Sequence, residues 1–199
     1  MSIMETVFRQ VRRRREQRKV AHLPDGFAAR RVIDIGCGLY PFPESVFPEA
    51  ATFYADYDPS NNPAERLNCR GTFCRVDVEN LPFADKAFDF VHCSNVLEHV
   101  SSPAQGFHEL QRIAHHGYIE CPSAFRENVI CHTGAHKWIV EFTPDGVATR
   151  APRETRVFGM RVLPMTWLYW TLVKARILWK LFDLLMGDCL GLMYRHHAF

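Results

Sequence analysis

The chain has 199 residues, of which 47% are hydrophobic and 23% are charged, and this composition excludes a disordered or collagen-like protein. Lysine and arginine (24) nearly balance aspartate and glutamate (22), so the overall charge gives no strong signal for a nucleic-acid partner. The 7 cysteines, an odd number without regular spacing, predict free thiols. The start of the chain runs into arginines instead of an apolar core, and we therefore expect a cytoplasmic protein without a secretory signal.

Residues 1–28 are predicted to hold a basic N-terminal helix. Met4, Phe8 and Val11 recur at helical spacing, and arginines crowd the segment between residues 9 and 18. Two interpretations remain open for this helix. It is either a solvated cover over one edge of the domain or a patch for an anionic partner such as a phosphorylated substrate, RNA or a lipid surface.

Residues 29–155 are predicted to form the main domain, because short apolar runs alternate there with turn and helix signals. The predicted strands are 32–35, 52–56, 72–76, 88–93 and 118–121. Alternation of this kind predicts βαβ units, an α/β fold and a Rossmann-like, mostly parallel sheet. Ligands of such sheets bind at the carboxyl ends of the strands, near the switch in strand order.

The strongest helix signal lies between the last two predicted strands. Ser102 can cap this helix, Pro103 suits its first turn, Gln105 can complete a capping box, and Gly117 is placed to terminate it. Its apolar face is formed by Ala104, Phe107, Leu110 and Ala114.

The loop after the first strand contains Gly36-Cys37-Gly38, a pattern that alone is weak. A dinucleotide site needs a third glycine and a helix N-terminus that receives the pyrophosphate. Here Tyr40 stands at the third glycine position, and the prolines that follow leave room for one helical turn at most. NAD and FAD are therefore disfavoured. S-adenosylmethionine, which has no phosphate, suits this loop better, and Asp56 stands where a ribose-binding acid belongs.

With these residues in place, the chain resembles the class I S-adenosylmethionine-dependent methyltransferases. The motifs VIDIGCG (32–38), FYADYDP (53–59), VDVENLPFADKAFDFV (76–91) and NVLEHV (95–100) follow one another in that family's order. The resemblance extends to residue 123. It implies S-adenosyl-L-methionine as the cofactor.

The resemblance also implies roles for residues in the loop after the first strand, which begins with Gly36-Cys37-Gly38 and which we call the donor loop. Asp34, Gly36 and Gly38 would shape this loop. Asp56 would hold the ribose hydroxyls of the donor, whereas Asp58, beside Pro59, is expected to cap a turn.

Further along the chain, the resemblance places four more residues against the donor. Asp77 and the backbone of Val78 would lie beside the adenine amino group. Ser94 and Asn95, which end the fourth strand, would face the methionine moiety and the methyl group.

Candidate catalytic residues follow the fourth and fifth strands. Glu98 and His99 are either a helix-start pair that orients a loop or part of the chemistry, and His136 is the preferred residue on the acceptor side, because its ordinary pKa suits proton removal at neutral pH. His132 and His136, beside Cys131, superficially suggest a metal site. A Glu-His pair after the fourth strand also resembles magnesium-using O-methyltransferases, which carry an additional acid where this chain has Asn95. We predict no metal.

Two elements complete the predicted architecture. Residues 138–142 and 147–149 flank Thr143-Pro144-Asp145-Gly146 and predict a hairpin that closes the sheet. Residues 156–199 are predicted to be an apolar helical extension, in which the stretch 165–186 is hydrophobic over most of a helix circumference. Such a helix would pack on the domain, form a homodimer, or contact a membrane surface or lipid-like substrate.

These observations predict a methyltransferase that acts on a small-molecule or glycan/lipid-like acceptor. The alternative is a noncatalytic relative that binds S-adenosylmethionine or serves as a scaffold.

Overall fold

The computed structural model describes residues 14–38, 41–63, 69–124, 126–127, 136–152, 156–157, 160–161 and 194–199. Several sequence predictions concern residues outside these ranges. They are the basic helix before residue 14, Tyr40 in the donor loop, Cys131 and His132, and the apolar stretch 165–186.

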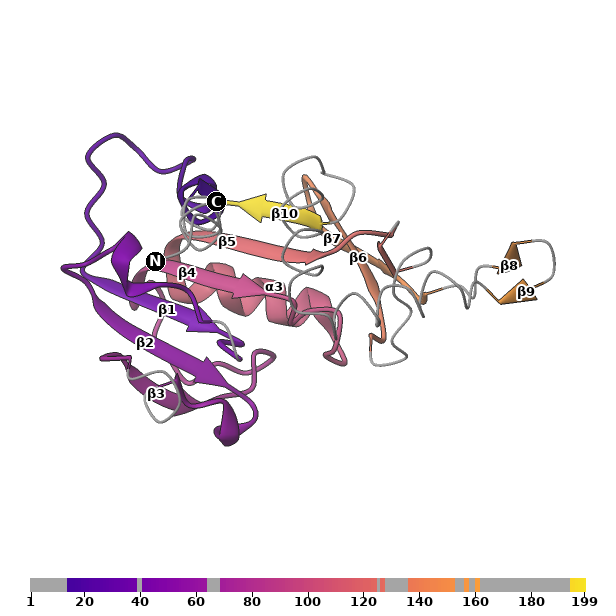
Figure 1. Cartoon of the computed structure of the whole chain (residues 1–199), viewed down its shortest axis with the longest axis horizontal. Coiled ribbons are helices and arrows are strands. Elements are labelled where there is room, and N and C mark those ends of the chain that lie inside the picture. The colour runs from indigo at the N-terminus through magenta and orange to yellow at the C-terminus, as the bar shows by residue number, and fades with distance from the viewer. Residues whose placement is uncertain are drawn as a thin grey trace, which may run out of the picture.

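A central sheet of six strands organises the described chain (Figure 1). Its strands are β1 (Arg31–Ile35), β2 (Ala51–Asp56), β3 (Thr72–Arg75), β4 (Phe88–Ser94), β5 (Ala114–Pro122) and β10 (Tyr194–Ala198). Their order is β10-β5-β4-β1-β2-β3. All neighbours are parallel except β10, which runs antiparallel to β5. The Rossmann-like, mostly parallel α/β fold predicted from the sequence is confirmed.

The order of the strands creates a switch point between β1 and β4. The chain moves from β1 outward to β2 and β3, and then returns to place β4 on the other side of β1. Connections that leave in opposite directions open a crevice at the carboxyl ends of these two strands, where ligands of such sheets bind. The donor loop follows β1 directly, and Asn95 follows β4.

Two single helical turns lie in the connections from β1 to β3, ahead of Pro63, which is itself a helix residue. They are the 3-10 turns η1 (Glu44–Val46) and η2 (Pro59–Asn61). Pro41, Pro43 and Pro48 crowd the β1–β2 connection, so the expectation of one turn at most is confirmed there. The described part of this connection therefore offers no α-helix N-terminus to a pyrophosphate.

The helix α3 (Pro103–Ile113) begins as the sequence predicts. The Ser102 side chain accepts a hydrogen bond from the Gln105 amide at 3.4 Å. The reciprocal half of the predicted capping box is different, because the Ser102 amide donates to Glu79 Oε1 at 2.7 Å. A side chain from a distant loop thus satisfies the orphan donor.

The predicted end of this helix at Gly117 is wrong. α3 ends at Ile113, and β5 begins at the next residue, Ala114. Gly117 lies inside β5, where a β-carbon would come within 2.6 Å of the Phe199 ring. The glycine is needed for close approach of the C-terminal residue instead of for a helix cap.

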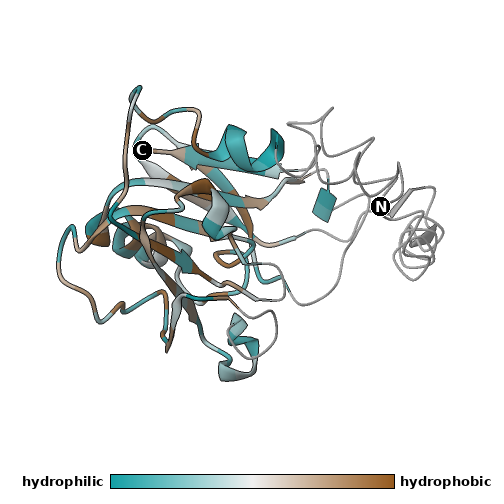
Figure 2. Ribbon diagram, turned by 60° about the vertical axis from the view of Figure 1, so that its left-hand side comes forward, coloured by the Kyte–Doolittle hydropathy of each residue, from teal (hydrophilic) through white to brown (hydrophobic). Residues whose placement is uncertain are grey.

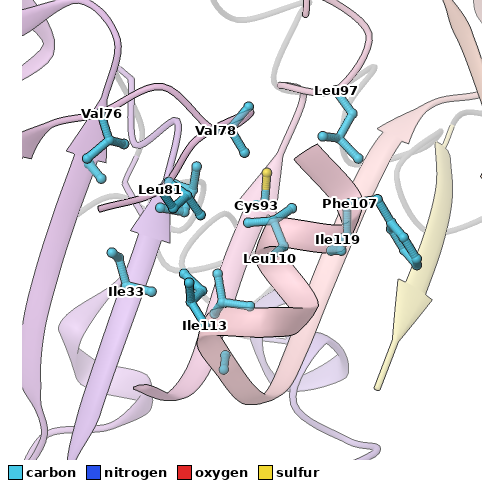
Figure 3. Close-up of a cluster of buried hydrophobic side chains, with 14 of the residues drawn as sticks. Ile33, Val76, Val78, Leu81, Cys93, Leu97, Phe107, Leu110, Ile113 and Ile119 are labelled. Atoms are coloured by element: carbon cyan, nitrogen blue, oxygen red, sulfur yellow. The ribbon is translucent and has the colours of Figure 1, made fainter. Parts of the chain in front are cut away.

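The two faces of the sheet are covered differently. One face packs against α3 and forms the main core, whose members include Ile33, Cys93, Leu97, Phe107, Leu110, Ile113 and Ile119 (Figure 3). The opposite face is covered near its middle by a second cluster that contains Val32, Phe42, Phe90 and Tyr118. Figure 2 shows brown hydrophobic segments interspersed with white and teal ones along the central strands. Burial of both faces is what a parallel sheet requires.

The predicted hairpin forms as β6 (Ile139–Thr143) and β7 (Gly146–Arg150). It is a separate two-stranded sheet, however, and the strand that closes the central sheet is β10. β10 pairs with β5 from Tyr194 opposite Pro122 to Ala198 opposite Tyr118, which leaves no free edge of β5 for the hairpin. The hairpin packs instead beside α3, where the Phe107 and Phe142 rings are 6.1 Å apart.

The described residues after residue 155 are strand residues, apart from Phe199 at the end of the chain. They comprise the short pair β8 (Arg156–Val157) and β9 (Met160–Arg161), and then β10. The apolar helix predicted for 165–186 is outside the described ranges, and the domain limits at 28 and 155 stay predictions. Within the described residues, no helix has both the length and the apolar character needed to cross a membrane.

Hydrogen bonds at the start of β1 suggest a test of the pairing of β1 with β4. Asp89 Oδ2 accepts hydrogen bonds from the amides of Arg30 and Arg31, at 2.7 and 2.8 Å. Partial burial would raise the pKa of Asp89, but these two amide hydrogen bonds outweigh it, and the pKa is lowered.

Because the folded-state pKa of Asp89 is below its ordinary value, its contribution to stability is present at neutral pH and is lost as the pH falls through the folded-state pKa. We expect Asp89→Asn to lower the free energy of unfolding by about 1–2 kcal/mol at pH 7, with a difference that shrinks below pH ~4. Urea unfolding of the wild type and of Asp89→Asn between pH 7 and pH ~3 measures this difference in free energy. A difference that stays constant with pH would contradict the assignment.

Candidate active site

The donor loop depends on a glycine that no other residue can replace without strain. Gly36 has φ +72°, and its amide donates to the Ala55 carbonyl at 2.7 Å. A β-carbon at Gly36 would overlap Cγ2 of Val96, which lies in the loop after β4. The loops after β1 and β4 therefore touch at this point, and glycine is required both by the backbone and by the contact.

Asp56, at the end of β2, holds the same loop. Its Oδ2 accepts from the Gly38 amide at 3.1 Å, and its Oδ1 accepts from the Asp58 amide at 2.9 Å. The carboxylate is partly exposed, and each oxygen keeps acceptor capacity beyond these single hydrogen bonds. A group that presents two such oxygens beside the donor loop can accept from a pair of neighbouring hydroxyls.

Asp58 has a different role from Asp56. Its Oδ1 accepts from the Ser60 amide at 2.9 Å and caps η2, as the sequence predicts. This backbone hydrogen bond lowers the pKa of the fully exposed Asp58 carboxyl.

Asp34 lies beneath the loop instead of inside it. Its side chain is 2% exposed, and its Oδ2 accepts from the Phe42 amide at 2.7 Å. Its Oδ1 is 2.6 Å from His92 Nδ1, and His92 Nε2 is 2.9 Å from Lys19 Nζ. We call Asp34, His92 and Lys19 the buried polar chain. It connects the donor loop with the helical residues 14–19.

A second buried acid, Glu120 on β5, organises the end of β4. Ser94 Oγ donates to Glu120 Oε1 at 3.0 Å, and Tyr118 Oη donates to Oε2 at 3.1 Å. Burial alone would raise the pKa of Glu120, but the charges of Lys19 and Arg15, with further neighbours, outweigh burial and lower it. Glu120 is therefore ionised at neutral pH.

Asn95 turns the chain away from the sheet immediately after Ser94. It has φ +57°, in the left-handed region that asparagine tolerates. Its amide donates to the Glu120 carbonyl at 2.9 Å, and its Nδ2 donates to Ser94 Oγ at 3.1 Å. The two residues expected to face the methionine moiety are thus adjacent and partly exposed at the carboxyl end of β4.

Asp77 and Val78 form a turn after β3. Asp77 Oδ1 accepts from the Glu79 amide at 2.9 Å, and the Asp77 side chain is exposed, whereas Val78 is buried. Asp77 thus makes the turn hydrogen bond that an ordinary turn residue would make. Its predicted place beside an adenine stays a prediction.

The candidate catalytic residues Glu98, His99 and His136 come together in space. One ligand-type atom of each lies within 4.8 Å of the others, and the His99 and His136 ring centroids are 4.6 Å apart. Backbone hydrogen bonds join the two segments, because the Lys137 and Trp138 amides both donate to the Glu98 carbonyl. Glu98 is 1% exposed, whereas His99 is exposed, so the cluster extends from the core to the surface.

Burial dominates the electrostatics of this cluster. It raises the pKa of Glu98 to about 7, although the charges of His136 and Arg126 favour the ionised form. The buried Cys121 thiol has a pKa raised well above its ordinary value by burial and by Glu98, and it brings no charge.

Sequence reasoning missed four of the residues that organise this region, namely Lys19, His92, Glu120 and Glu127. A signal existed for His92 and Glu120, which are polar residues inside apolar strand runs. The strand register sets His92 beside Asp34 and Ser94 beside Glu120, and this register is not visible in the sequence.

The central part of the chain is similar to known methyltransferases. Residues 33–119 match the family model described as a methyltransferase domain. They run from β1 into β5 and include the loops after β1, β2, β3 and β4. The match confirms the resemblance to class I methyltransferases.

The curated relatives are matched over part of their length. An uncharacterized methyltransferase from Mycolicibacterium gilvum is 35% identical over 91 residues, which is 43% of this chain. An uncharacterized protein from Methanocaldococcus jannaschii is 35% identical over 82 residues, or 41% of this chain. The chain spans about a third (35%) of the length of each. A solved putative S-adenosyl-L-methionine-dependent methyltransferase from Methanococcus maripaludis is 22% identical, with a TM-score of 0.46 over 59% of this chain and 58% of that one.

The Gly36 geometry predicts the effect of an added methyl group. We expect Gly36→Ala to lower the free energy of unfolding by about 1–2 kcal/mol for the positive φ, with roughly 1–3 kcal/mol more for the overlap with Val96. Gly26→Ala is the matched control, because Gly26 has φ +75° and nothing within 4 Å of the added carbon. Denaturant unfolding measures both, and equal losses would contradict the contact with Val96.

Proposed function

We propose that this chain is an S-adenosylmethionine-dependent methyltransferase acting on a small-molecule or glycan/lipid-like acceptor. One observation carries the proposal. The residues matched by the methyltransferase family model form β1–β5, and the acid at the end of β2 lies against the loop after β1. The same edge of the sheet holds the switch point.

The residues around the donor loop fit S-adenosylmethionine. Gly38 and Asp56 offer a close backbone approach beside a carboxylate with remaining acceptor capacity, which suits two ribose hydroxyls. In the described part of the β1–β2 connection, one 3-10 turn takes the place of the helix that a dinucleotide pyrophosphate needs. Asp34, Gly36 and Gly38 would shape the loop.

The remaining donor contacts are those that the resemblance to class I methyltransferases implies. Asp77 and Val78 would lie beside the adenine, and Ser94 and Asn95 would face the methionine end. The side chains of Asp77, just after β3, and Asn95, just after β4, are both exposed, which supports this arrangement.

S-adenosylmethionine supplies a methyl group already activated on a sulfonium. The chain then has to align the acceptor nucleophile, because effective alignment lowers the barrier of an in-line displacement. Glu98 and His99 would occupy the acceptor side, since they closely follow Val96, the residue that approaches Gly36, and His136 lies beside them. Segment 165–186 would provide the apolar contact for a lipid-like acceptor, a membrane surface or a second copy.

Calorimetry with S-adenosylmethionine, S-adenosylhomocysteine and NAD tests the proposal. We expect saturable binding of both adenosyl compounds and none of NAD. Tight binding of NAD alone would contradict it. Donor binding without turnover on any acceptor of the stated classes would favour the noncatalytic alternative.

The assignment of the ribose-binding acid has a sharper test. Asp56→Asn keeps an oxygen for the Gly38 amide but loses the charge, and it should weaken S-adenosylhomocysteine binding at least ~10-fold, since each hydrogen bond to a charged group contributes about 1.5–3 kcal/mol. Asp58→Asn is the matched control and should change the dissociation constant by less than about 3-fold. If both folded variants bind equally well, Asp56 does not hold the ribose.

A further inference from the structure

We propose that Glu98, His99 and His136 form a binding site for a divalent transition-metal ion, and that the ion of best fit is Zn²⁺. The three side chains come from two segments, and one ligand-type atom from each lies within 4.8 Å of the others. The proposal goes beyond methyl transfer and does not require that the donor bind.

Glu98 provides the carboxylate of the proposed site. Its carboxylate is buried, and neither oxygen has a hydrogen-bond partner among the described residues. A buried carboxylate without a partner is strongly unfavourable, and native proteins pair such groups or use them to coordinate metal ions. Of the side chains around it, the two imidazoles are those that would share a cation with it.

The set of metal-ligand atoms in the proposed site fits zinc. Two imidazole nitrogens and one carboxylate oxygen are the ligands of catalytic zinc sites, in which three protein ligands leave one position open. Magnesium and calcium prefer oxygen ligands throughout, so a set with two histidines disfavours them. The open position would take a water molecule or an oxygen of a bound acceptor.

A second carboxylate, that of Glu127, lies behind His136. Glu127 Oε1 lies 2.8 Å from His136 Nδ1, and Glu127 is only 1% exposed. The two atoms are within ion-pair distance, although neither is counted among the hydrogen-bonded atoms of the described residues. A carboxylate beside one imidazole nitrogen leaves the other nitrogen for the metal, which is the place that outer carboxylates take in other metal sites.

The site is also organised before any ion arrives. The Lys137 amide donates to the Glu98 carbonyl at 2.8 Å, and the Trp138 indole donates to the Val100 carbonyl at 3.0 Å. These bonds fix the segment of His136 against the segment of Glu98 and His99. The exposed His99 gives an ion a path from solvent to the buried carboxylate.

The proposal replaces two expectations from the sequence, namely that the chain holds no metal and that His136 removes a proton. An imidazole nitrogen that coordinates a metal is not available as a base. His136 would instead hold the ion.

The experiment uses the full chain, stripped of metal by a chelator and then titrated with ZnCl₂ by calorimetry, without donor or acceptor. Co²⁺ serves as a second probe, because its visible spectrum reports coordination. We expect one equivalent to bind, with a rise in melting temperature on addition of Zn²⁺. Glu127→Gln should weaken Zn²⁺ binding about 10–100-fold, and Glu98→Gln and His136→Gln should weaken it at least as much. His108→Gln, an exposed histidine on α3, should leave it within about 2-fold.

Two results would overturn the proposal. One is the absence of saturable Zn²⁺ binding to the folded wild-type chain, and the other is equal binding by wild type, Glu98→Gln and Glu127→Gln. If Glu98→Gln does not fold, Glu127→Gln and the Co²⁺ spectrum of the wild type decide. Because no donor is present, failure here is separate from failure of donor binding.

Discussion

The buried polar chain of Asp34, His92 and Lys19 is the interaction on which the rest of the site depends. It replaces apolar packing on one face of the sheet at the carboxyl ends of β1 and β4, where Asp34 is 2.6 Å from His92 and His92 is 2.9 Å from Lys19. Removing one member of such a chain leaves its neighbours unpaired in a low dielectric, which is more unfavourable than losing a surface hydrogen bond. The chain therefore fixes the donor loop through Phe42 and ties the N-terminal segment to the switch point.

A second constraint is the contact between the loop after β1 and the loop after β4. This contact connects the donor loop with the expected acceptor side. Gly36 leaves room for Val96, and two residues after Val96 the chain places Glu98 in the core. The donor loop and the Glu98–His99–His136 cluster are therefore mechanically connected through one short segment. The charges of His136 and Arg126 only partly offset the burial of Glu98, whose pKa is raised to about 7.

Much of the fold could be predicted from the sequence, because strand periodicity, proline positions and the Ser102 cap are local signals. The failures were non-local. Gly117 signals a helix end, but close approach by Phe199 places it in a strand, and the hairpin was expected at an edge that β10 occupies. In the site, motif order located Asp34 and Asp56, yet His92, Glu120 and Glu127 emerged only from strand register and folding back of the chain.

We expect the donor to lie at the carboxyl ends of β1 and β2 and to be held there by Asp56. A crystal structure of the full chain with S-adenosylhomocysteine would show where the donor is bound. We expect both ribose hydroxyls within hydrogen-bond distance of the Asp56 carboxylate, with the adenine beside Asp77 and Val78. A bound ligand whose ribose contacts another acid, or which lies away from the Gly36–Gly38 loop, would contradict it.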